Sequence, residues 1–148
     1  MSQPLSNLRQ MEQRISLITL GVDDLDRART FYEQGLGWEP RSAPEGVVFY
    51  QLPGIALALF GRADLAADAQ HQIDGRFSGI TIAINQRSEA DVDAVLQQAA
   101  AAGATILKPA QKVFWGGYSG YFADLDGHVW EVALNPEWTI NDDGTLTI

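Results

Sequence analysis

Along this chain, segments with the composition of a β-strand alternate with segments whose apolar residues recur at the spacing of an α-helix. The order of these segments is the same in both halves. Residues 15–22 are rich in β-forming side chains and predict a strand. Residues 24–34 carry an apolar stripe at helical spacing, with Asp23 or Asp24 as N-cap and glycines at the end. Three strands are then expected: a short one beginning at Trp38, followed by residues 47–52 and 55–60.

The second half repeats this order. Residues 79–84 predict a strand, and Ser88 begins a helix that ends near Gly103. Three further strands are predicted at residues 105–107, 117–123 and 128–134. A half of this size buries too little surface to be stable alone. We therefore expect one α+β domain built from two βαβββ modules, whose curved four-stranded sheets enclose a cavity.

The expected boundaries follow from these segments. The connector between the modules is polar and contains several alanines, so a linker is favoured over a short helix. The tail carries an Asp143-Gly144 turn signal, which predicts a small hairpin or edge strand. Whether Met1 or Met11 is the natural start stays open. The expected segments are an N-terminal arm at 1–14, the first module at 15–61, the connector at 62–77, the second module at 78–136 and the tail at 137–148.

The segment from Phe114 to Pro136 is the most informative part of the chain. It predicts two strands joined by a tight turn at residues 124–127. In the second strand His128, Trp130, Val132 and Leu134 share one face, and Val129, Glu131 and Ala133 share the other. Both faces are mostly apolar, which predicts a strand covered on both sides. Glu131 is the exception, because burial disfavours a charged carboxylate.

Composition and charge exclude several classes of function. Hydrophobic residues make up 46% of the chain, the formal net charge is −9, and there is no cysteine. Thiolate metal sites and disulfides are therefore excluded. Without clustered Lys and Arg, neither nucleic acid nor an anionic membrane is an expected partner. No apolar run is long enough to span a bilayer, so a cytoplasmic protein is the default expectation.

Aromatic and polar side chains around Glu131 predict a ligand pocket. Glu131 itself has two interpretations: a carboxylate that binds a cationic or hydroxylated ligand or acts as a general base, or one that is hydrogen-bonded and idle. The aromatic residues also have two: the wall of a pocket, or packing in the core and at a subunit interface. The expected pocket residues are Phe49, Gln51, Trp115, Tyr118 and Tyr121.

Two motifs resemble those of the vicinal oxygen chelate superfamily, which includes glyoxalase I, bleomycin-resistance proteins and extradiol dioxygenases. The first is Gly-Val-Asp-Asp-Leu-Asp-Arg-Ala-Arg-Thr-Phe-Tyr-Glu-Gln-Gly-Leu-Gly-Trp at residues 21–38, and the second is Asp-Leu-Asp-Gly-His-Val-Trp-Glu-Val at residues 124–132. One departure is Leu125, where the family turn usually has proline. The resemblance implies two paired βαβββ modules and a homodimer.

The resemblance also implies where a divalent metal would be held: by inward-facing residues on the first and last strands of each module. These positions fall on Leu17, near Ala58, on Gly79 (or on Ile80 or Thr81), and on Glu131. Zn²⁺, Mn²⁺ or Fe²⁺ needs at least three protein donors, and of Leu17, Ala58, Gly79 and Glu131 only Glu131 offers one. We therefore expect no metal or other cofactor at this place.

Neither histidine corresponds to a metal position. His71 lies in the connector, where a solvated surface histidine is expected. His128 lies at the turn and should point away from Glu131. The resulting expectation is a metal-free homodimer of the glyoxalase/bleomycin-resistance type that binds a small organic molecule. The alternatives are a metal-independent lyase or isomerase with Glu131 as general base, and a metal-dependent enzyme with displaced ligands.

Overall fold

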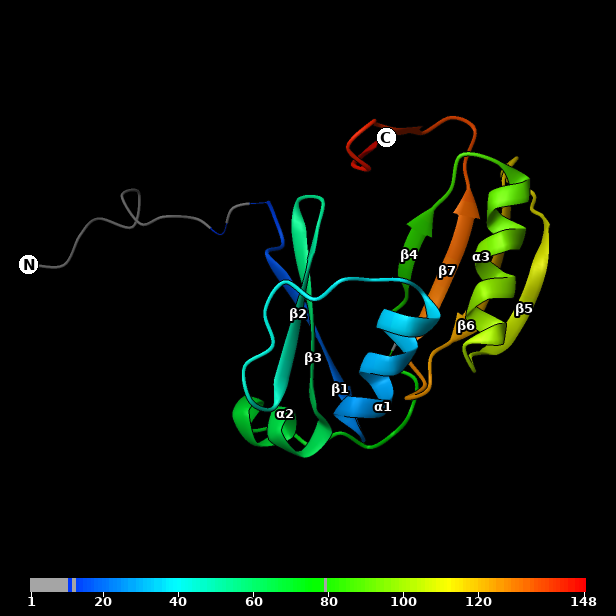
Figure 1. Ribbon diagram of the computed structural model, residues 1–148. Helices are drawn as coiled ribbons and strands as arrows, with labels where there is room; N and C mark the ends of the chain where they lie inside the picture. The colour runs from blue at the N-terminus through cyan, green and yellow to red at the C-terminus, as the bar shows by residue number, and fades with distance from the viewer. Residues whose placement is uncertain (1–10, 12, 79) are drawn as a thin grey trace, which may run out of the picture.

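The computed structural model describes residues 11, 13–78 and 80–148 and contains two mixed sheets (Figure 1). The first sheet has the order β1-β3-β2, formed by β1 (Leu17–Val22), β2 (Val47–Leu52) and β3 (Ile55–Gly61). The second has the order β4-β7-β6-β5, formed by β4 (Ile82–Asn85), β5 (Thr105–Lys112), β6 (Tyr118–Ala123) and β7 (Val129–Leu134). In each sheet the first strand pairs in parallel with the last, and the other pairs are antiparallel. The expected α+β class is confirmed.

Helices cover the sheets from the sides that form the core. Helix α1 (Leu25–Thr30) begins at Asp24, whose side chain accepts a hydrogen bond from the Arg27 backbone, and it continues into the π-helical turn η2 (Phe31–Gly35). Figure 1 shows α1 lying between the two sheets. Helix α3 (Glu89–Ala101) begins at Ser88 and packs on β5, β6 and β7. Both N-caps were expected from the sequence.

One core joins the two modules. Phe31 and Tyr32 from η2 pack against Phe122 and Trp130 of the second sheet, with ring centroids 6.5 Å apart for Phe31–Phe122 and 6.3 Å apart for Tyr32–Trp130. Phe122 and Trp130 are stacked. Trp130 and Val132 are buried on the face of β7 that points toward the helices. The halves therefore depend on each other for the burial of their apolar faces.

Two of the expected strands differ in the structure. The short strand at Trp38 does not form; an isolated bridge between Ser42 and Phe49 is all that remains of it, so the first sheet has three strands. Two prolines, at 40 and 44, remove backbone donors in this segment. The expected strand at 105–107 instead extends to Lys112 through Pro109, with register shifts. Proline is tolerated because β5 is an edge strand and the chain bulges there.

The connector and the second module's first strand also differ in detail. Residues Arg62–Ala69 form helix α2, so the first part of the expected linker is helical. Strand β4 is shorter than expected and shifted toward the C-terminus, and Gly79 lies outside the described residues. The same is true of most of the expected N-terminal arm.

The tail forms the expected hairpin, with β8 (Thr139–Ile140) and β9 (Leu146–Thr147). It leaves the end of β7 and extends toward the first module (Figure 1). An Arg87 guanidinium nitrogen donates to the Asn141 carbonyl at 2.9 Å, and the hairpin turn lies against Pro53, whose Cγ would be 3.2 Å from a Cβ on Gly144. The hairpin therefore bridges the two modules. Within the described residues, no helix has the length and apolar character needed to cross a membrane.

Candidate functional site

Glu131 lies in β7 on the face of the second sheet that points away from α3. Its cross-strand neighbours are Tyr121 in β6 and Ala83 in β4. The Tyr121 hydroxyl donates to Glu131 Oε2 at 2.9 Å. Burial raises the pKa of the Tyr121 phenol, and its hydrogen bond to Glu131 raises that pKa further. Both side chains are half-buried rather than fully enclosed, so within the described part of the chain this face of β7 is only partly covered.

Trp115 lies next to the same region of the second sheet. Its indole occupies the space that a side chain at Gly117 would fill. Gly117 directly precedes β6, and alternate residues of a strand point to the same face of the sheet. This space therefore lies on the face of Ser119 and Tyr121. Ser119 is buried there, and it lies opposite Ala133 in β7. Two of the expected pocket residues, Trp115 and Tyr121, thus belong to the same side of the second sheet as Glu131.

The other expected pocket residues lie elsewhere. Tyr118 points to the α3 side, where its hydroxyl donates to Asp93 at 2.7 Å. Phe49 and Gln51 lie in β2 of the first sheet, opposite Ala58 and Ala56 of β3. The Gln51 amide donates to the Leu52 carbonyl within its own hairpin. Alternation of β2 and β3 places Phe49 and Gln51 on the face of the first sheet that points away from α1.

The positions at which the family holds a metal offer few donors in this chain. Leu17 and Ala58 lie on the first sheet with apolar side chains, and Gly79, outside the described residues, has no side chain. Glu131 is already hydrogen-bonded to Tyr121. Within the described part of the chain, no three His, Cys, Asp or Glu side chains gather in a way that could hold an ion. The residues at these positions therefore do not fit a divalent metal site.

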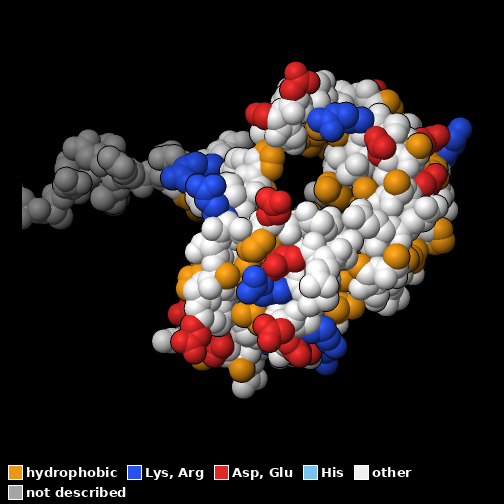
Figure 2. All heavy atoms as spheres, viewed as in Figure 1, with side chains coloured by type: hydrophobic (Ala, Val, Ile, Leu, Met, Phe, Trp, Pro, Cys, Tyr) orange, Lys and Arg blue, Asp and Glu red, His pale blue; other side chains and the backbone are white. Residues whose placement is uncertain are grey.

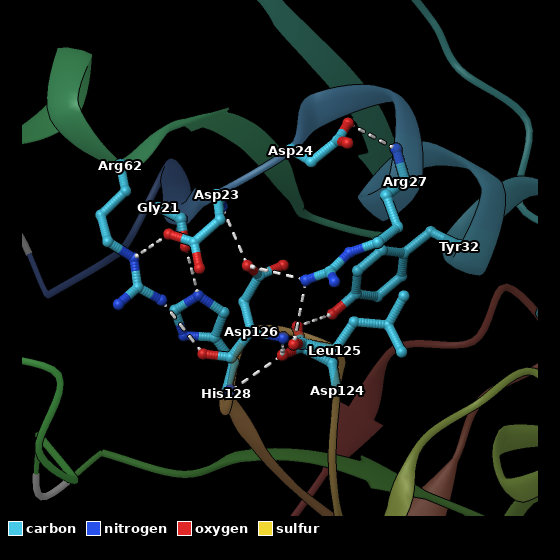
Figure 3. A network of polar contacts seen from close by, with 10 residues as sticks. All are labelled: Gly21, Asp23, Asp24, Arg27, Tyr32, Arg62, Asp124, Leu125, Asp126 and His128. Carbon is cyan, nitrogen blue, oxygen red and sulfur yellow. Dashed lines mark hydrogen bonds and ion pairs between the residues drawn. The ribbon is translucent and has the colours of Figure 1, made fainter.

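The turn after β6 holds the two modules together (Figure 3). Asp124 is buried, and its Oδ1 accepts hydrogen bonds from the backbone nitrogens of Asp126 and His128 at 2.9 and 2.8 Å. Its Oδ2 accepts from the Tyr32 hydroxyl of the first module at 2.7 Å. Gly127 takes a φ of 84°, as the turn requires. Asp124 thus shapes this turn and fastens it to the core.

His128 and Asp126 make further contacts between the modules. His128 Nε2 lies 2.7 Å from the Gly21 carbonyl oxygen at the end of β1, and Asp126 Oδ1 accepts from the Asp23 backbone at 2.9 Å. An Arg62 guanidinium nitrogen donates to the Asp126 carbonyl, and Arg62 Nε pairs with Asp23 at 3.2 Å without a well-aligned hydrogen bond. Figure 3 shows these side chains converging on the turn from both modules. The contacts of His128 are structural, and His71 is exposed.

A large apolar cavity lies between the modules, and none of the residues expected to form the ligand pocket lines it. Its volume is about 710 Å³. In Figure 2 an opening passes beneath the C-terminal hairpin, with hydrophobic side chains at its rim. Glu131, Tyr121 and Trp115 do not line it. The walls come from β1, β3, β4, the hairpin and two indoles, and include Ile18, Trp38, Ile84, Trp130, Ile140 and Leu146.

Comparison with known proteins agrees with this architecture. Residues 14–132 match the model of the Glyoxalase/Bleomycin resistance protein/Dioxygenase superfamily. The chain is 32% identical over 124 residues to the metallothiol transferase FosB of Shouchella clausii (strain KSM-K16), covering 82% of this chain and 80% of that protein.

Solved structures show the same fold. A glyoxalase-related enzyme from Fulvimarina pelagi is 38% identical, with a TM-score of 0.87 over 93% of this chain and 99% of that one. A lactoylglutathione lyase from Agrobacterium tumefaciens is 26% identical, with a TM-score of 0.64 over 84% of this chain and 96% of that one.

Proposed function

Because the chain belongs to the glyoxalase/bleomycin resistance protein/dioxygenase superfamily, we propose that it binds a small organic molecule beside Glu131, without a metal at the family's usual positions. The observation that carries this proposal is the hydrogen bond between the Tyr121 hydroxyl and Glu131 Oε2, 2.9 Å long, on a half-open sheet face. Glu131 keeps further acceptor capacity, because a carboxylate has about four lone-pair sites.

The surrounding groups indicate the chemistry of the ligand. A half-buried carboxylate accepts hydrogen bonds from a hydroxyl or a cationic amine, and the bond is stronger when the donor is charged. The Trp115 indole lies against Gly117 next to this face, where an aromatic or aliphatic part of the ligand can pack. The ligand class is therefore an organic molecule with an apolar ring or chain and a hydroxyl or a cationic amine.

We also propose that the protein is a homodimer, because parts of both sheets are exposed among the residues that the structure describes. In the described sheets, β1 and β4 each pair with a neighbour on one side only. Large apolar side chains next to these edges are exposed, among them Leu17, Phe77 and Ile80. An unpaired edge flanked by exposed apolar residues favours association, and a two-fold dimer is the most frequent solution.

A second candidate is a metal-independent lyase or isomerase that uses Glu131 as general base. What favours it is the relationship to a structure described as a glyoxalase-related enzyme, 38% identical over nearly the whole chain. Against it, the Tyr121 hydroxyl already occupies one oxygen of the carboxylate that would accept the substrate proton. We therefore place binding before catalysis.

The test uses the variant Glu131→Gln, which keeps the shape of the side chain and removes its charge. A panel of phenols and benzylamines, whose amino groups are cationic at neutral pH, is titrated calorimetrically into the wild type, into this variant and into Glu137→Gln, an exposed control. We expect binding of at least one compound to weaken about tenfold or more in Glu131→Gln only. Normal binding with loss of turnover in Glu131→Gln would support the enzyme instead. Equal binding to all three proteins would refute a role for Glu131.

A further inference from the structure

We propose that the cavity beneath the C-terminal hairpin is a second binding site, for a small, uncharged and mainly apolar molecule. Its volume of about 710 Å³ lies within the range of small-molecule pockets, which is roughly 300–1,000 Å³. The site is separate from the one proposed at Glu131, since neither Glu131 nor its partner Tyr121 lines the cavity. Its walls come from both modules and from the tail.

The lining selects against charge. Among the described residues around the cavity none is charged, although 20% of the chain's residues are. An ionised ligand would lose its hydration there without gaining a partner. The Trp130 indole N–H donates to the Tyr32 hydroxyl at 3.2 Å, so this ring offers its apolar surface to a ligand. Trp38 lies edge-on to Trp130 with ring centroids 6.0 Å apart, which gives the cavity an aromatic wall.

One polar side chain at the cavity has no internal partner. Asn85, at the end of β4, lines the cavity, and its side-chain amide makes no hydrogen bond to any other described residue. Thr81, directly before β4, adds a hydroxyl. Pockets of this kind combine apolar walls with a few polar groups that orient the ligand. The expected ligand therefore carries a single hydroxyl, carbonyl or amide at one end of an apolar body.

The hairpin determines the kind of occupant. Ile140 and Leu146 form part of the wall, and the hairpin is held to the second module through Arg87 and lies against Pro53 of the first. The hairpin spans the cavity (Figure 2). A strand or helix of another protein would have to thread beneath it, whereas a small molecule can enter through the opening. The geometry therefore favours a small molecule over a peptide or a second copy.

The experiment titrates the full chain with N-phenyl-1-naphthylamine, an uncharged apolar dye whose fluorescence rises when it leaves water. We expect saturable binding of one dye per chain. Leu146→Asp puts a charge into the wall at an exposed position and should weaken binding about tenfold or more, the loss expected for one large apolar contact. Ile84→Trp, which fills the cavity, should do the same. The sulfonated analogue 8-anilino-1-naphthalenesulfonate should bind the wild type at least tenfold more weakly.

Two controls separate this site from other surfaces. Leu107→Asp changes an exposed leucine on β5, away from the cavity, and should leave the affinity for the dye unchanged. Glu131→Gln should also leave it unchanged, so failure of the proposal at Glu131 does not affect this one. Absence of saturable binding, or unchanged binding in Leu146→Asp, would overturn the inference. So would loss of dye binding as the protein dimerises, because the partner would then occupy the cavity.

Discussion

The Tyr32 hydroxyl donates to Asp124 Oδ2 at 2.7 Å, joining the helical segment of the first module to the β6–β7 turn of the second. The same hydroxyl accepts from the Trp130 indole at 3.2 Å. Both Tyr32 and Asp124 are buried, so neither can exchange its partner for water. This pair links the two halves of the chain, which have the same order of elements, at the place where their shared core meets the turn.

Removing either member should destabilise the whole fold. Tyr32→Phe leaves Asp124 Oδ2 and the Trp130 N–H without a partner, and we expect it to lower the free energy of unfolding by about 2 kcal/mol. Asp124→Ala removes the acceptor of three hydrogen bonds and should cost about 3 kcal/mol or more. Urea denaturation measures both. Tyr118→Phe, whose hydroxyl contacts Asp93 on α3, is the control and should cost less than about 1 kcal/mol.

The same pair predicts a loss of stability in alkali. Burial raises the pKa of the Tyr32 phenol well above its usual value, and the Asp124 carboxylate raises it further. Above about pH 10 the unfolded chain therefore loses a proton that the folded chain keeps, and the free energy of unfolding falls by about 1.4 kcal/mol per pH unit for this group. Below that pH the contribution of the Tyr32 phenol to the free energy of unfolding is fully present. In Tyr32→Phe the slope above pH 10 should be smaller by this amount; an unchanged slope would contradict the assignment.

Gly120 is predicted to be a packing position rather than a flexible one. A Cβ there would lie 2.7 Å from Leu96 Cδ1 and 2.8 Å from the Lys108 carbonyl oxygen. The carbonyl belongs to the backbone and cannot rotate away, so Gly120→Ala should lower the free energy of unfolding by about 1–3 kcal/mol. Gly21→Ala, whose nearest neighbour is the flexible Leu65 side chain at 3.2 Å, is the matched control and should cost less.

The proposed homodimer predicts a molecular mass of twice 16.2 kDa in light scattering after gel filtration. Leu17→Asp and Phe77→Asp place charges on exposed apolar positions beside the free strand edges, and we expect both to shift the protein toward the monomer. Leu107→Asp, on an exposed position of β5, should leave the mass unchanged. A monomeric wild type at all concentrations would refute the dimer.

The sequence predicted most of the fold, because its main signals are local. The Asp24 and Ser88 caps, the Gly127 turn and the alternation around Trp130 each depend on a few neighbouring residues. The missing strand at Trp38 and the extension of β5 through Pro109 depend instead on strand position in the sheet, which decides whether a backbone donor is needed.

The candidate site was predicted only in part for a similar reason. The motif around Glu131 and the cross-strand neighbour Tyr121 follow from strand alternation and register. The direction of Tyr118 depends on where α3 packs, and the cavity depends on how two sheets and a tail come together. Local periodicity carries no information about such distances, so Trp38 and Trp130 could not be recognised as walls of one cavity.

We propose that this chain uses the Glu131 position without the metal of its family. The most direct test is the metal content of protein purified without chelators, measured by inductively coupled plasma mass spectrometry for the wild type and for Glu131→Gln. We predict divalent metal far below one ion per chain in both proteins, because Leu17, Ala58 and Gly79 provide no side-chain donors. A content near one Zn²⁺, Mn²⁺ or Fe²⁺ per wild-type chain that Glu131→Gln abolishes would contradict it.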